Sequence, residues 1–205
     1  MLESETNLEI LLKGWKLVAR DPRLRLFVSA NLLEIFSNTI WVSSIILVFV
    51  TELLNKTESY WGYSNTAYSI GIIISGLIAF RLSEKFLAAK WESILFSLVA
   101  MAIVTLTILL FPNAQMFLVF SALVGMLSQL KEVPESVFLQ ETVEENNLVN
   151  VYSVLEVIST LAFSVFVLLM SYITENFGIS ISFWLSAICL MIEAILIYIR
   201  RDYFK

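Results

Sequence analysis

The chain has 205 residues, of which 59% are hydrophobic and 15% are charged, and its mean hydropathy is +0.83. This is more apolar surface than a soluble domain of this length can bury, so the composition excludes a soluble globular protein and predicts one that is solvated by lipid. The formal net charge of −5 says little about partners, because several acids fall inside apolar runs, and we expect no nucleic-acid partner.

Cysteine and histidine usage narrows the chemistry further. The single cysteine, Cys189, excludes an internal disulfide, and the absence of histidine removes the usual proton relay at neutral pH. Carboxylates are therefore the candidate proton carriers. The sequence has no metal-ligand cluster and no glycine-rich phosphate loop, so we predict neither an enzyme nor a cofactor.

No basic segment precedes an apolar core at the N-terminus, so we expect no cleavable signal peptide.

Residues 1–25 form a basic, amphipathic segment before the first apolar run. Thr6 and Glu9 fit a capping box. Apolar side chains then recur at helical spacing, at Leu8, Leu11, Leu12, Trp15 and Val18. The pattern predicts a short helix that ends near Asp21-Pro22. This helix either lies on the cytoplasmic membrane surface or packs on cytoplasmic loops.

Six apolar runs follow, and each is long enough to cross a hydrocarbon core of about 30 Å as an α-helix. They cover residues 26–53, 63–83, 91–111, 115–140, 149–173 and 179–199. Because lipid offers the backbone no hydrogen-bonding partner, runs of this length must be helical. We therefore predict an all-α membrane domain of six transmembrane helices over residues 26–205.

Basic residues are distributed unevenly between the two sides of these runs. If the N-terminus is cytoplasmic, eleven of the thirteen Lys and Arg residues lie inside, Lys56 lies outside and Lys131 lies within the fourth run. The positive-inside rule then places both termini in the cytoplasm, and the chain is predicted to be a multi-pass protein of the cell inner (plasma) membrane.

Carboxylates within the apolar runs are the strongest functional signal. An ionised side chain at the bilayer centre costs about 2.5–3.5 kcal/mol on insertion scales, so each carboxylate needs water, a partner or a proton. Four acids are placed in this way, namely Glu34, Glu132, Glu156 and Glu193. All four lie roughly 10–14 Å from the cytoplasmic ends of their runs at helical rise, which predicts a layer of carboxylates.

The first run has a polar face, because Asn31, Glu34, Asn38 and Trp41 recur at i, i+3, i+7 and i+10. We expect Glu34 to couple protons or bind substrate rather than only to form a structural hydrogen bond. Trp41 either packs or forms an aromatic floor for a substrate. The candidate proton-coupling and substrate residues are Glu34, Asn31, Asn38, Trp41, Gln129, Glu132 and Glu156.

Other residues of the runs have simpler interpretations. Glu132 and Glu156 lie close enough to the cytoplasm to be merely solvated there, and Glu193 is expected mainly to form an interhelical hydrogen bond. Lys131 points about 100° away from Glu132, so it either snorkels to the cytoplasm or pairs with Glu135 or with an acid of another helix. A stripe of small residues, Ala67, Gly71, Ser75 and Ala79, predicts close helix packing.

Three stretches resemble the C-terminal half of Major Facilitator Superfamily transporters, and in particular the bacterial macrolide and multidrug exporters. They are LLKGWKLVARDPRLRLF at 11–27, YWGYSNTAYSIGIIISGLIAFRLSEKF at 60–86, with Gly62 and Gly71, and VPESVFLQETV at 133–143. Two loops depart from the family pattern. Leu87 stands where the loop after the second run usually has glycine, and the loop ETVEENNLVN before the fifth run lacks Lys and Arg.

The resemblance implies one half of a major facilitator fold, built as a 3+3 inverted repeat, with its first and fourth helices lining a cavity. It further implies a secondary active transporter, a proton-coupled antiporter for efflux of drugs or small amphipathic molecules, as in multidrug resistance. The expected partners are lipid, protons, the substrate, and either a missing N-terminal six-helix half or a second six-helix chain. The alternative from a different class is a membrane structural or regulatory subunit without transport activity.

Overall fold

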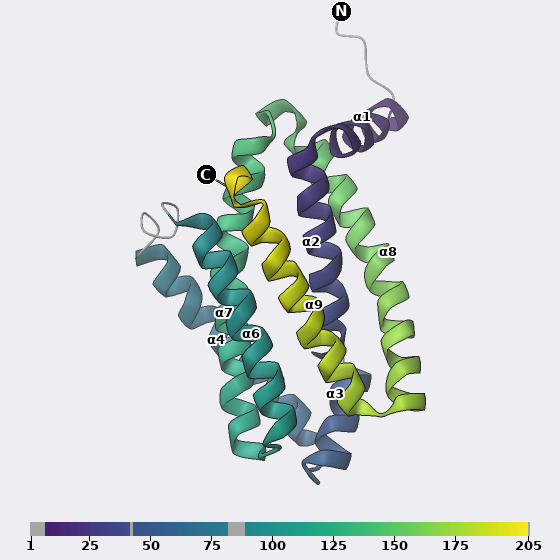
Figure 1. Ribbon diagram of the computed structural model, residues 1–205, viewed down its shortest axis with the longest axis vertical. Helices are drawn as coiled ribbons and strands as arrows, with labels where there is room; N and C mark the ends of the chain where they lie inside the picture. The colour runs from purple at the N-terminus through teal and green to yellow at the C-terminus, as the bar shows by residue number, and fades with distance from the viewer. Residues whose placement is uncertain (1–6, 42, 82–88, 205) are drawn as a thin grey trace, which may run out of the picture.

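The computed structural model describes residues 7–41, 43–81 and 89–204, and the regular elements in these ranges are all helical (Figure 1). The α-helices are α1 (Asn7–Arg20), α2 (Pro22–Asn38), α3 (Ser43–Val48), α4 (Ser59–Arg81), α6 (Lys90–Leu110), α7 (Ala114–Thr142), α8 (Glu145–Phe177) and α9 (Ile179–Ile199). Two 3₁₀ turns, Thr39–Trp41 and Arg201–Phe204, and a π-helical turn, Phe49–Leu53, complete them. In the described ranges, helices α4, α6, α7, α8 and α9 are each long and apolar enough to cross a membrane, and the bent pair Pro22–Trp41 and Ile45–Leu53 is a sixth candidate when counted as one span. The predicted six-helix all-α fold is confirmed.

The first span is broken rather than continuous over 26–53. Its two parts, Pro22–Trp41 and Ile45–Leu53, are inclined to each other by 42°. At the break, the Thr39 hydroxyl donates to the Phe36 carbonyl oxygen at 2.6 Å, which replaces regular α-helical bonding by a tighter turn.

The start of α2 also lies earlier than the predicted boundary at residue 26. Pro22 occupies the first turn, where its missing N–H removes no hydrogen bond, and the Asp21 carboxylate accepts from the Arg23 backbone N–H at 2.8 Å. Partial burial of Asp21 opposes its ionisation. The hydrogen bonds and the charge of Arg23 outweigh that effect and hold the pKa of the Asp21 carboxyl below its ordinary value.

Helix α1 packs across one end of α8. Val18 is buried against Val151 and Val154, and Gly14 lies so close to α8 that a Cβ there would come 2.5 Å from the Asn150 carbonyl oxygen. The expected helix is therefore present and one of its faces packs on the bundle. Leu12 and Trp15 remain exposed on α1 and are free to contact the membrane surface. Thr6 of the predicted capping box lies outside the described residues.

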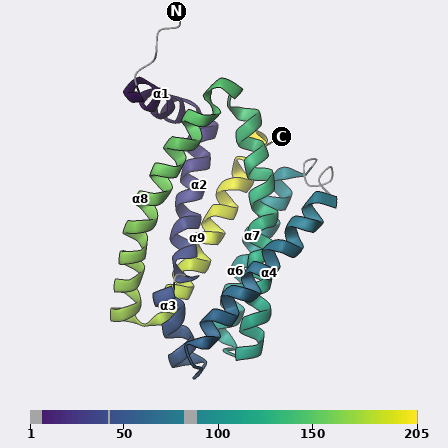
Figure 2. The ribbon, with the colours of Figure 1, turned by 180° about the vertical axis from the view of Figure 1, so that it is seen from behind.

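The long helices form two groups, α4 with α6 and α7, and α2 with α8 and α9 (Figure 2). The groups are joined where α6 packs on α9 through a core that includes Leu98, Met101, Leu190 and Ala194. Helices α2 and α7 make few direct contacts with each other. Helix α1 and the C-terminal turn lie at the same end of the bundle, as the charge distribution predicts (Figure 1).

Helices α4 and α7 cross closely at two glycines. A Cβ added to Gly71 would lie 1.9 Å from the Ala122 carbonyl oxygen, and one added to Gly125 would lie 2.2 Å from the Tyr68 carbonyl oxygen. The small-residue stripe on α4 therefore serves close packing, as predicted, because a larger side chain would force the two backbones apart.

Gly71→Ala is expected to destabilise the protein by about 1–3 kcal/mol, since the obstructing atom belongs to a backbone and cannot rotate away. Gly76→Ala is the matched control, because Gly76 lies on the same helix with no atom within 4 Å of its added Cβ. Thermal unfolding in detergent, followed by size exclusion, measures both variants. Equal midpoints for the two variants would contradict the close crossing.

Candidate functional site

A cavity of about 390 Å³ is lined by residues of α2, α4, α7 and α8. Its ionisable lining residues are Glu34, Tyr68, Lys131, Glu132, Glu135, Tyr152 and Glu156. Its amide and hydroxyl lining residues are Asn31, Asn38, Ser128, Ser136 and Ser159. The predicted polar face of the first span thus forms one wall of a polar chamber at membrane depth.

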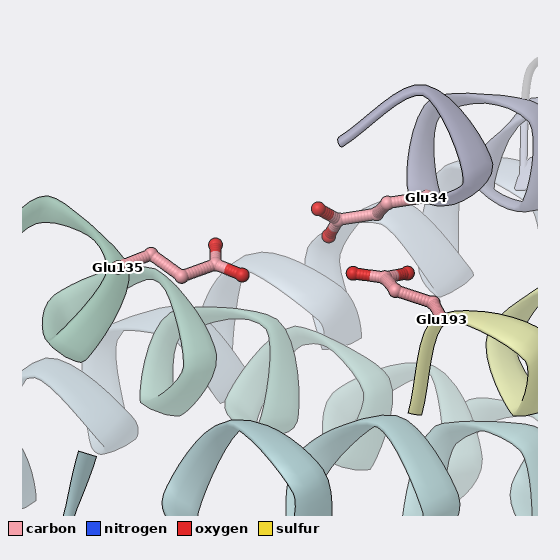
Figure 3. Close-up of side chains that lie close together, drawn as sticks. All are labelled: Glu34, Glu135 and Glu193. Carbon is pink, nitrogen blue, oxygen red and sulfur yellow. The ribbon is translucent and has the colours of Figure 1, made fainter. Parts of the chain in front are cut away.

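The Lys131 ammonium is the centre of the site. Its Nζ lies 2.5 Å from Glu34 Oε2 and 2.9 Å from both carboxylate oxygens of Glu135, while Glu193 Oε1 is 3.9 Å away. The three carboxylates come from α2, α7 and α9 and point toward one another (Figure 3). Of the two alternatives for Lys131, pairing with Glu135 and with an acid of another helix is therefore confirmed.

Glu193 differs from its expected role. It is fully buried, with 0% of its surface exposed, and within the described part of the chain neither carboxylate oxygen has a hydrogen-bond partner. The interhelical hydrogen bonds of α9 are made by serines instead, as between Ser186 Oγ and Ser37 Oγ at 2.7 Å. The charge of Glu193 is therefore balanced at ion-pair distance by Lys131 or is removed by a proton.

The Lys131 cluster, meaning Lys131 with Glu34, Glu135 and Glu193, has an unequal charge balance. Three ionised carboxylates and one ammonium would carry a net charge of −2 in a largely dehydrated region, where charge interactions are strong. Each bound proton removes one negative charge. The three carboxylates have oxygens within 4.8 Å of one another, a spacing suited to a cation, but the Lys131 ammonium lies among them and supplies that charge.

The two asparagines of α2 are tied into the same wall. Asn31 accepts a hydrogen bond from Ser159 Oγ of α8 at 2.9 Å, and Asn38 Nδ2 donates to Glu34 Oε1 at 3.4 Å. Glu34 therefore contacts both the cavity and Lys131. These residues lie together as their helical spacing predicts, and their functional roles stay predictions.

Glu132 and Glu156 line opposite walls of the cavity, on α7 and α8, and both are exposed to it. Among the residues that the structure describes, neither makes a hydrogen bond or an ion pair. Gln129 is half-buried on α7 but is not among the lining residues of this cavity.

Trp41 lies at the end of the first part of the broken span and lines a second, smaller cavity of about 240 Å³. Its ring stacks on Phe117, with centroids 6.4 Å apart, so Trp41 both packs and presents an aromatic surface. The two cavities adjoin, because Asn38, Tyr68 and Ser128 line both of them.

Sequence reasoning left Lys131 and Glu135 out of the candidate site. Their i, i+4 spacing was the available signal, since it predicts an ion pair on one face of α7. The acid of α2 that completes the pair is 97 residues away in sequence, so only the tertiary structure shows that Lys131 serves several carboxylates.

A bundle of membrane spans around a charged cavity is an arrangement found in membrane transport proteins. The chain belongs to the Major Facilitator Superfamily, whose family model matches residues 27–205. Two curated relatives from Bacillus subtilis strain 168 are the uncharacterized MFS-type transporters YfmI, 27% identical over 185 residues, and YjbB, 28% identical over 187 residues. These matches cover 90% and 91% of this chain but 46% of each relative.

The fold is also that of a solved transporter. The POT family transporter PepTSo matches with a TM-score of 0.69 and 16% identity, over 88% of this chain and 37% of that chain. At this identity the likeness shows the fold alone. The chain thus spans about half the length of the curated relatives it matches, in a family of transporters rather than enzymes.

Proposed function

We propose that the chain forms one six-helix half of a proton-coupled secondary transporter of the cell membrane, which exports small amphipathic molecules. The observation that carries this proposal is the Lys131 cluster, where an unequal number of acids and bases borders a cavity. Resemblance to macrolide and multidrug exporters supports the direction of transport. Protonation would exchange with a cationic substrate because either one reduces the negative charge of the same cavity.

Glu34 is the proposed coupling residue. Glu34 is the ion-pair partner that α2 contributes to Lys131, and it also lines the cavity. Its charge therefore affects both the interhelical ion pair and a bound substrate. A proton on Glu34 would weaken the α2–α7 ion pair and favour one conformation, whereas ionised Glu34 would favour the other. The other titratable groups around it are Tyr68 of α4, Lys131, Glu132 and Glu135 of α7, Tyr152 and Glu156 of α8, and Glu193 of α9.

The cavity charge favours a cationic substrate. Four carboxylates and one ammonium line the chamber, and Glu34 and Glu135 already bond to that ammonium. Glu132 and Glu156 therefore remain to attract a positively charged group. The adjoining cavity, with Trp41, Ile46 and Tyr68, offers an apolar and aromatic surface for the rest of an amphipathic cation.

A second six-helix unit would complete the transporter. Glu132 and Glu156 cannot face lipid without a large free-energy cost, and a second bundle opposite α2 and α7 would enclose them with water. This unit is either a missing N-terminal half or another six-helix chain. We expect the chain on its own to self-associate or to be unstable, without vectorial transport.

Transport driven by a pH gradient tests the proposal. The experiment uses inside-out membrane vesicles that have an acidic lumen and contain the protein with any partner that purifies with it. These vesicles should accumulate tetraphenylphosphonium. They should not accumulate tetraphenylborate, which has the same shape and the opposite charge. Accumulation should cease when nigericin dissipates the pH gradient. Accumulation equal to that of vesicles without the protein would instead favour the alternative of a structural or regulatory subunit.

A further inference from the structure

A second charged feature lies between the first turns of α2 and the end of α9, and it shares no lining residue with the cavity. A groove of about 370 Å³ is lined there by Arg25 and Ser29 of α2, and by Leu196, Arg200 and Tyr203 at the end of α9. No carboxylate is among its lining residues. Within the described part of the chain, neither arginine forms a salt bridge, although Arg200 lies over the Tyr203 ring at 6.0 Å.

The groove lies at the level of lipid headgroups. Arg25 is in the first turn of α2 and Arg200 directly follows α9, so both stand at the ends of membrane spans on the positively charged side. The groove and the cavity at the Lys131 cluster share no lining residue.

An apolar track leads from the groove toward the bilayer centre. Ile188, Ile192 and Leu196 precede Arg200 at four-residue intervals and so lie in one row along α9. Ile188 and Ile192 are each about half exposed, so they offer an apolar surface for an acyl chain.

We propose that this groove binds an anionic phospholipid such as phosphatidylglycerol, independently of the proposed transport function. The lipid phosphate lies between the Arg25 and Arg200 guanidinium groups, which suit phosphate oxygens in geometry and charge, and accepts from the Tyr203 hydroxyl. One acyl chain follows the row of Ile192 and Ile188. A zwitterionic headgroup binds less well, because the groove has no carboxylate for its ammonium.

The test measures lipid binding and thermal stability of the purified protein, together with any partner that purifies with it. The protein is kept in mixed detergent micelles of phosphatidylcholine with rising amounts of phosphatidylglycerol. The wild type should retain phosphatidylglycerol in native mass spectra and unfold at a higher temperature as its fraction rises. Arg25→Gln/Arg200→Gln should lose most of that shift and retain at least tenfold less lipid. The control, Arg20→Gln/Arg81→Gln, removes the same charge from exposed positions outside the groove and should behave as the wild type.

The alternatives give different results. Equal losses in the two double variants would show a general response to membrane charge and overturn the site. Millimolar inorganic phosphate that reproduced the stabilisation without lipid would show an anion site rather than a lipid site, and would also overturn the proposal. If the double variant folds poorly in pure phosphatidylcholine, lipid retention by Arg200→Gln alone decides the question, and undiminished retention contradicts the proposal.

Discussion

Lys131→Met is expected to reduce the stability of the protein by about 3–5 kcal/mol, as is usual when one partner of a buried ion pair is removed. The side chain is 2% exposed, and its removal leaves Glu34, Glu135 and Glu193 facing one another without a counter-charge. Thermal unfolding in detergent measures the loss. The loss should be smaller at pH 5 than at pH 8, because protonation of the unpaired carboxylates removes their repulsion.

Lys90→Met is the matched control for this variant. Lys90 also pairs with a glutamate, Glu141, but that carboxylate is 58% exposed to solvent. Such a pair contributes about 0–1 kcal/mol, so its loss should be small. Adding Glu193→Gln to Lys131→Met should restore part of the stability. If Lys131→Met were as stable as Lys90→Met, the ion pairs of the Lys131 cluster would not contribute to the stability of the protein, and the prediction would be wrong.

Glu34→Gln is expected to abolish transport driven by a pH gradient while substrate binding survives. The amide keeps the shape of the side chain, and its oxygen can still accept from Asn38, but it cannot take up and release a proton. Direct titration with tetraphenylphosphonium should show binding with reduced dependence on pH. Vesicle uptake, measured as above, should fall to the level of vesicles without the protein.

Glu193→Gln is the comparison for Glu34→Gln, since Glu193 belongs to the Lys131 cluster but is not among the lining residues of the cavity. Its effect on transport should be much milder. Retained pH-driven transport in Glu34→Gln, together with loss in Glu193→Gln, would assign the coupling carboxylate to α9 rather than to α2.

The helical framework could be predicted because apolar runs in lipid have one structural solution. Helices α4 to α9 extend no more than four residues beyond the predicted runs. The break after the turn Thr39–Trp41 could not be predicted, since the segment has neither proline nor glycine, which are the usual sequence signals of a kink.

The residues of the site could be predicted only where their spacing along a single helix places them on one face. Asn31, Glu34 and Asn38 share a face of α2, so their spacing alone places them together. The convergence of α2, α7 and α9 on Lys131 depends on helix packing, which a single sequence does not encode in any local pattern. Gln129 was included by polarity, but its position on α7 leaves it out of the cavity lining.

Proton release on substrate binding tests most directly the claim that a cationic substrate displaces a proton from the carboxylates of the cavity. Tetraphenylphosphonium is added to the purified protein, in its isolated assembly, in weakly buffered solution near neutral pH with an indicator dye. We expect the wild type to release protons in proportion to the cation bound, and Glu34→Gln to bind the cation with little or no release. Cation binding without proton release in the wild type, or undiminished release in Glu34→Gln, would contradict the account.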